Sequence, residues 1–147
     1  MNRLLLLLLL LPAWAGAQKT APVVIMDFVQ VKDNRFDEAI YYYQQNWRLY
    51  REAALQKGFI TGYRMVQTKE DSLAPFHLVL ITEYADSAQY SRSEQNFEGI
   101  IKELRPNGPA LLNEWKPGDF RRNLFFKEAR QLAGSADKRW KKITKRS

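Results

Sequence analysis

The order of apolar and polar residues along the chain predicts four strands and two helices. Four segments rich in β-branched and aromatic residues are bounded by turn residues and predict strands, at 21–32, 59–69, 76–85 and 120–130. Apolar residues at helical spacing predict one helix over 34–57 and a second from Asp86 or Ser87 to the sequence RPNGP. The order β-α-β-β-α-β indicates an α+β, ferredoxin-like fold with both helices on one face of an antiparallel sheet.

The first helix has recognisable start and stop signals and one apolar stripe. Asp33 and Asn34 are expected to cap its start, and Gly58 is expected to end it. The stripe that should face the sheet is Phe36, Ile40, Tyr43, Trp47, Tyr50 and Ala54. In the second helix the apolar spacing is kept by Phe97, Ile100, Ile101 and Leu104.

Both faces of the predicted sheet carry apolar side chains. Along the first strand, alternation places Val23, Ile25, Val29 and Val31 on one side and Val24, Met26 and Phe28 on the other. Along the third strand, Phe76, Leu78 and Leu80 oppose His77, Val79, Ile81 and Glu83. A sheet with one solvated face alternates apolar and polar residues cleanly, so we expect the second face to pack on another subunit in a homodimer.

The N-terminus resembles a secretory signal. Arg3 precedes eight leucines (residues 4–11), and Ala15-Gly16-Ala17 offers a cleavage site. We therefore expect a signal peptide at 1–17 and an exported, periplasmic or secreted, domain at 18–133. The apolar run is shorter than the roughly 20 residues of a spanning helix. The alternative is a retained N-terminal anchor.

Charge and cysteine content exclude several kinds of site. The chain has a formal net charge of +7, but residues 134–147 hold six Lys/Arg and one Asp, and residues 18–133 carry only 16 − 15 = +1. We expect no nucleic-acid partner, and a tail that is either disordered or, with Trp140, in contact with anionic lipid headgroups. The chain has no cysteine, which excludes disulfides and thiolate metal sites. No metal-binding histidine pair is present either.

Residues 22–130 resemble the dimeric α+β-barrel superfamily, in which two ferredoxin-like sheets close face to face. The resemblance rests on the element order, on Phe97, and on the sequence HLVLITEYADSAQY, which is similar to the third strand and helix entry of antibiotic-biosynthesis-type monooxygenase domains. It implies a homodimer with a pocket between sheet and helices in each subunit. It implies no single reaction, because one fold hosts many functions.

Two enzyme classes of this superfamily are poorly matched. The haem-degrading members would need asparagine, tryptophan and histidine where this chain has Asp27, Ser93 and Glu103. The rhamnose mutarotases share a tryptophan eleven residues before a glycine, as in Trp47 and Gly58, but have a histidine in place of Tyr43. A tyrosine does not carry protons near neutral pH without a large pKa shift. We therefore expect no haem and no other cofactor.

Asp27 is the candidate catalytic residue. It shares a strand face with Ile25 and Val29, and a carboxylate among apolar side chains should have a raised pKa that suits a general base. The alternative is a structural ion pair with Arg64 or Arg122. His77 and Glu83 are about 20 Å apart along the strand and cannot act as one dyad. The lone histidine is therefore interpreted as a satisfied polar group.

The candidate ligand-binding residues are aromatic. The sequence AIYYYQQNWRLY at 39–50 concentrates tyrosines and a tryptophan on the first helix, and the candidate wall is Tyr43, Trp47, Tyr50 and Tyr84. Aromatic residues at this spacing also suit a solid core. Three hypotheses follow: a binding protein for a small apolar or aromatic ligand, a cofactor-independent monooxygenase of quinol-like substrates with Asp27 as base, and a structural or interaction protein that uses its basic tail.

Overall fold

The computed structural model describes residues 21–132, and it confirms the predicted fold class. One antiparallel sheet in the order β2-β3-β1-β4 is formed by β1 (Val23–Val31), β2 (Gly62–Gln67), β3 (Leu78–Tyr84) and β4 (Arg121–Arg130). The central strand β1 pairs with β3 on one side and with β4 on the other. This is the ferredoxin-like order. The expected signal peptide and basic tail lie outside the described residues.

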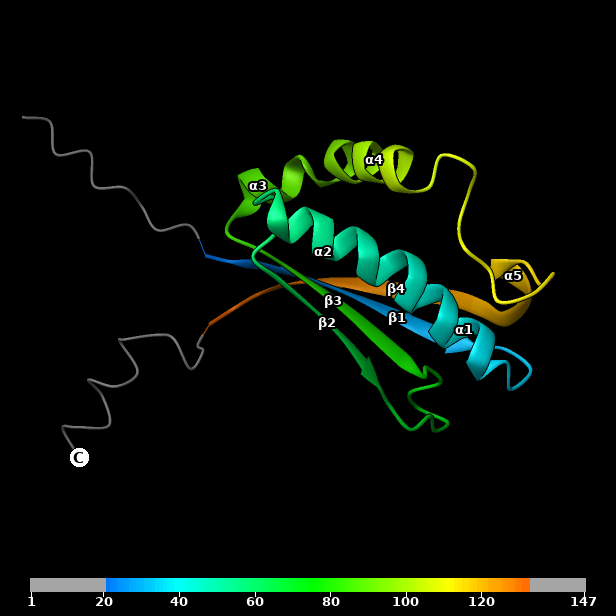
Figure 1. The fold of residues 1–147 in the computed structure, drawn as a ribbon. Helices are drawn as coiled ribbons and strands as arrows, with labels where there is room; N and C mark the ends of the chain where they lie inside the picture. The colour runs from blue at the N-terminus through cyan, green and yellow to red at the C-terminus, as the bar shows by residue number, and fades with distance from the viewer. Residues whose placement is uncertain (1–20, 133–147) are drawn as a thin grey trace, which may run out of the picture.

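The helices cover one face of the sheet (Figure 1). They are α1 (Phe36–Tyr42), η1 (Tyr43–Arg48), α2 (Leu49–Gln56), α3 (Ser87–Ser91), α4 (Ser93–Leu104) and the single turn α5 (Pro117–Phe120). The segments α1, η1 and α2 follow one another without a break and form the predicted first helix. The predicted second helix is interrupted at Arg92 and becomes α3 and α4. Within residues 21–132, no helix is long and apolar enough to cross a bilayer.

The predicted stop of the first helix is confirmed, and the predicted cap is wrong. Gly58 has φ +71°, its N–H donates to the Leu55 carbonyl, and the next N–H donates to the Ala54 carbonyl. These two bonds close the helix in a Schellman motif, which requires the left-handed conformation that glycine adopts easily. Asp33 and Asn34 are themselves left-handed and form a turn before the helix, so neither side chain caps it.

The entry to β3 differs from the predicted alternation. The Phe76 ring contacts the Phe28 and Phe125 rings at centroid distances of 4.8 and 6.4 Å, on the sheet face away from the helices. His77 is buried beside the Phe36 ring of α1, not on the side of Val79. The reason is that both residues precede β3, so regular alternation begins only at Leu78.

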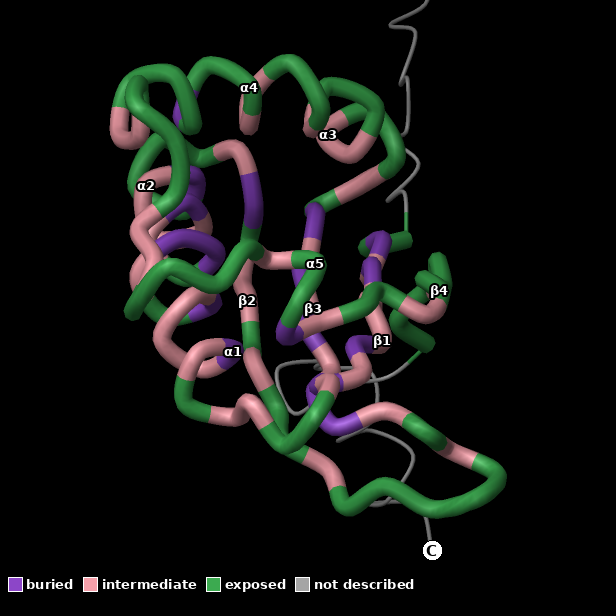
Figure 2. Tube along the Cα trace, turned by 90° about the vertical axis from the view of Figure 1, so that its right-hand side faces the viewer, coloured by how far each residue is buried: buried purple, intermediate pink, exposed green. Residues whose placement is uncertain are grey.

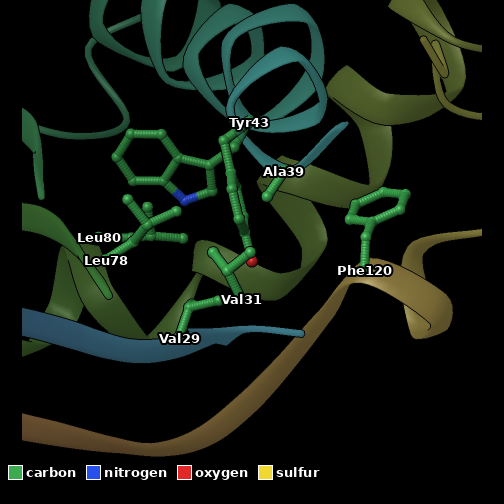
Figure 3. Close-up of a cluster of buried hydrophobic side chains, with 8 residues drawn as sticks. Val29, Val31, Ala39, Tyr43, Leu78, Leu80 and Phe120 are labelled. Carbon is green, nitrogen blue, oxygen red and sulfur yellow. The ribbon is translucent and has the colours of Figure 1, made fainter. Parts of the chain in front are cut away.

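The core lies between the sheet and the long helix, where the buried residues gather (Figure 2). One cluster contains Val29, Val31, Ala39, Tyr43, Trp47, Leu78, Leu80 and Phe120. In Figure 3 the Tyr43 ring projects from the helix toward Val29 and Val31 of β1. A second cluster, toward α4, contains Val23, Ile25, Tyr50, Ala54, Ile60, Tyr84 and Ile100. The predicted apolar stripe of the first helix therefore faces the sheet. In the second helix, Ile100 is buried as expected, but Ile101 is exposed.

Candidate functional site

A cavity of about 190 Å³ lies between the long helix and the centre of the sheet. Its lining is Asp27, Val29, Tyr42, Tyr43, Asn46, Trp47, Tyr50, Arg51, Leu80, Arg121 and Asn123. Four of the five candidate residues from the sequence, Asp27, Tyr43, Trp47 and Tyr50, therefore line one cavity. Tyr84 does not line it, because its ring packs on Tyr90 at a centroid distance of 5.2 Å.

The helix is π-helical where it borders the cavity, over η1, and Asn46 lies in this segment. Its side-chain amide donates to the carbonyls of Tyr42 (2.8 Å) and Ala110 (2.9 Å), and its oxygen accepts from the Ala110 N–H (2.8 Å) and Arg105 Nε (3.3 Å). Asn46 thus ties the loop after α4 to the helix at the cavity wall. Segments of π-helix are rare and often accompany functional sites.

A bulge in the pairing of β1 with β4 decides which β4 side chains face the cavity. Phe28 pairs with Phe125, but Val29 pairs with Asn123, so Leu124 is the extra residue. One extra residue reverses the alternation of the strand beyond it. As a result Asn123 and Arg121 line the cavity, while Arg122 donates to Gln30 Oε1 at 2.8 Å.

Arg51 of α2 enters the cavity from the helix side. Its guanidinium carbon lies 4.1 Å from the centroid of the Phe97 ring and 4.8 Å from that of the Trp47 ring, while Nε donates to Thr82 Oγ1 at 3.2 Å. Burial lowers the pKa of Arg51 to about 10. The side chain is therefore a cation at neutral pH, and no ion pair to it is present among residues 21–132.

Arg121 enters from the sheet side, at the start of β4. Its guanidinium carbon lies 4.8 Å from the Tyr42 ring centroid, and Nη2 reaches the Tyr42 hydroxyl at 3.4 Å. Arg121 Nε and Trp47 Nε1 are both buried, and neither has a hydrogen-bond partner within the described part of the chain. A buried donor without a partner costs about 1–3 kcal/mol, so each of these two lining residues holds an unsatisfied polar group.

Asp27 lies at the floor of the cavity on β1, but neither expected ion pair forms. Arg64 pairs with Glu83, and Arg122 bonds to Gln30 on the other face. Asp27 Oδ1 accepts from Asn123 Nδ2 at 3.4 Å. The cavity that Asp27 lines also contains two arginines, so the purely apolar setting expected from the strand pattern is incomplete.

Tyr43 and Tyr50 of the cavity are hydrogen-bond groups and not proton carriers. Burial raises the pKa of Tyr43 to about 12, and it also raises the pKa of Tyr50. Their hydroxyls are therefore protonated at neutral pH and are able to donate to a ligand.

His77 lies outside the cavity and is satisfied, as predicted. Its Nδ1 accepts from the Val31 N–H at 2.9 Å, and its Nε2 lies 2.9 Å from Glu70 Oε2. Over the described range, no three His, Cys, Asp or Glu side chains come together in a way that would hold a metal ion.

Sequence reasoning missed the polar half of the cavity. Arg51 stands one helical turn after Trp47, a spacing that places both side chains on one face, but an arginine there is ordinarily solvated. Arg121 and Asn123 carried no signal, because the bulge that turns them inward leaves no mark in the sequence pattern. Asn46 also had no signal.

Comparisons with known proteins add no function. No protein-family model matches the chain, and no curated protein matches it significantly. The crystal structure of HapK from Hahella chejuensis is similar with a TM-score of 0.46 and 15% identity, over 78% of this chain and 98% of that one. An uncharacterized NIPSNAP-like domain protein from Burkholderia xenovorans gives 0.38 and 13%, over 80% and 89%. At these TM-scores neither likeness carries an argument, and the fold assignment rests on the strand order of this chain.

Proposed function

We propose that this protein binds a small, largely aromatic ligand in the cavity between the long helix and the sheet. The observation that carries the proposal is the lining itself. Tyr43, Trp47 and Tyr50 provide aromatic surface, and Trp47 Nε1 and Arg121 Nε are buried donors that lack a partner in residues 21–132. Ligand sites are typically apolar cavities with a few polar groups that fix orientation.

The volume of the cavity is enough for one or two rings of a ligand. Its volume is about 190 Å³, and an apolar cavity of roughly 150 Å³ admits benzene. The test is a screen of single-ring and two-ring compounds by ligand-observed NMR, followed by titration of the variants Tyr43→Phe, Trp47→Leu and Asp27→Asn. Loss of the Tyr43 hydroxyl should weaken a polar aromatic ligand by about 1 kcal/mol, or up to about 3 if a partner is left unpaired.

The matched control is Tyr41→Phe, which changes a tyrosine of the same helix outside the cavity lining. A ligand whose affinity is indifferent to all three cavity variants binds elsewhere and contradicts the proposal. Under that outcome the aromatic residues of the helix serve packing alone.

A cofactor-independent monooxygenase of quinol-like substrates is the second candidate. The observation in its favour is that Asp27 lines the same cavity as Tyr43 and Trp47, so a carboxylate is available to accept a substrate proton. Oxygen uptake with a quinol panel tests it, and Asp27→Asn should abolish the uptake. Turnover that survives this change would assign the base to another group. The third hypothesis is a structural or interaction protein that acts through its basic tail, and it requires no ligand in the cavity.

We also propose that the protein is an exported homodimer. Support for the dimer comes from the sheet face away from the helices, which carries an aromatic cluster of Phe28, Phe76 and Phe125 with centroids 4.6–6.4 Å apart. Support for export comes from the sequence of residues 1–17 alone. The intact mass of the exported protein should correspond to a chain that begins at Gln18, and a major form that retains Met1 would contradict cleavage.

A further inference from the structure

The charged side chains that line the cavity indicate the chemistry of the ligand more specifically than the volume of the cavity does. Two guanidinium groups, Arg51 and Arg121, and one carboxylate, Asp27, line it. Neither arginine has an ion pair in the described part of the chain, and Asp27 accepts only a long contact from Asn123. The lining therefore holds one more positively charged side chain than negatively charged ones.

The two arginines are held in place although they lack a carboxylate partner. Arg51 is stacked on Phe97 and bonded to Thr82, and Arg121 is stacked on Tyr42 and reaches its hydroxyl. Burying an unpaired charge is costly unless a counter-charge is supplied. The guanidinium group of arginine is well suited to bind a carboxylate, so two fixed guanidinium groups without an ion pair favour an anionic ligand.

The remaining polar groups of the lining limit the rest of the ligand. Trp47 Nε1 is a donor that lacks a partner among the described residues, on a side chain with 8% exposure, and Tyr43 is a protonated hydroxyl. Asp27 is the one acceptor-only side chain in the lining. A ligand that matches all of these groups carries an anion for the arginines, a ring for the aromatic wall and a donor for Asp27.

We propose that the ligand is a hydroxylated aromatic carboxylate, with Arg51 and Arg121 supplying the charge that binds its carboxylate and Asp27 accepting from its ring hydroxyl. The inference rests on the proposed function of the cavity and deepens it. It distinguishes aromatic acids from neutral phenols and quinols, which present no anion to the arginines at neutral pH.

The test compares matched probes on the full chain. The probes are 4-hydroxybenzoate, 6-hydroxy-2-naphthoate, the carboxamide of each, and 4-methoxyphenol, titrated at pH 7.5 by calorimetry. We expect each acid to bind at least tenfold more tightly than its amide, because a hydrogen bond to a charged group is worth roughly tenfold or more in affinity. This comparison uses the unmodified protein and does not depend on whether any variant folds.

Variants then assign the effect to the two arginines. Arg51→Gln and Arg121→Gln should each lower acid affinity about tenfold or more and leave amide affinity within about twofold. Arg51→Lys should restore part of the acid preference. The matched controls are Arg48→Gln on the same helix and Arg122→Gln on the same strand, two exposed arginines outside the lining, and neither should change affinity.

The two proposals fail in different ways. Equal binding of acids, amides and 4-methoxyphenol, all weakened by Trp47→Leu, would overturn the acid inference and support the cavity as a binding site. Acid binding that is unaffected by both arginine variants would also overturn the inference. Absence of binding by every probe, in calorimetry and in ligand-observed NMR at millimolar concentration, would count against both.

Discussion

Each face of the sheet departs at one place from the usual division between an apolar inside and a polar outside. The face beneath the helices is covered, yet it presents Asp27, Asn123 and Arg121 to a cavity. The opposite face has no cover among residues 21–132, yet its centre is the cluster of Phe28, Phe76 and Phe125. Polar groups on a buried face indicate a binding site, and an uncovered apolar face indicates association.

The largest contrast between the faces should appear in the stability of matched phenylalanine variants. Phe120 is 1% exposed in the core beneath the helices, and Phe125 is 44% exposed on the open face. Phe120→Ala should lower the free energy of unfolding by about 3–5 kcal/mol, as expected for a fully buried ring. Phe125→Ala should cost less than half of that in a monomer, measured by urea denaturation at low protein concentration. Equal losses would show that the faces do not differ in burial.

Association through the open face can be tested by placing a charged side chain on it. Sedimentation at micromolar concentration should give twice the chain mass for the unmodified protein, and Phe28→Asp should give a folded monomer, because a carboxylate is not tolerated in an apolar interface. The control is Phe126→Asp. This residue is 60% exposed and pairs with Asp27 in the register, which places it on the helix side of the sheet. A monomeric unmodified protein would refute the dimer.

The polar wall beneath the helices depends on Asn46. Asn46→Ala removes four hydrogen bonds and leaves the Ala110 N–H and carbonyl without this partner. We expect a loss of about 2–3 kcal/mol in the free energy of unfolding, together with faster amide exchange in the loop around Ala110. Asn96→Ala, on α4, is the control. An unchanged exchange rate at Ala110 would mean that the loop is held by other contacts.

The smallest expected effect is a pH dependence of the free energy of unfolding, caused by Tyr43 beneath the helices. The pKa of Tyr43 is about 12 in the folded chain and about 10 when unfolded, so its contribution to stability is present below pH 10 and is lost as pH rises toward 12. Raising the pH from 9 to 11 should therefore reduce the stability of the unmodified protein relative to Tyr43→Phe by about 1 kcal/mol. The comparison between the two proteins cancels the opposite titration of Arg51. A constant difference would show that Tyr43 is accessible to water.

The sequence by itself determined the fold class and the aromatic half of the site. The period at which apolar residues recur differs between strands and helices, so the sequence indicates the type and order of the elements and which face of each is buried. For that reason Tyr43, Trp47 and Tyr50 were placed on the sheet side of the helix, and Asp27 was placed beneath them.

Only the tertiary structure decided the polar half. The bulge at Leu124 reverses the alternation of β4 and turns Arg121 and Asn123 inward, and the π-helical segment places Asn46 against a loop 64 residues away. Tyr84 was among the candidate ligand-binding residues, but its ring packs on Tyr90 and does not line the cavity. These outcomes depend on register and on contacts between distant segments, and neither is encoded in the period of a single element.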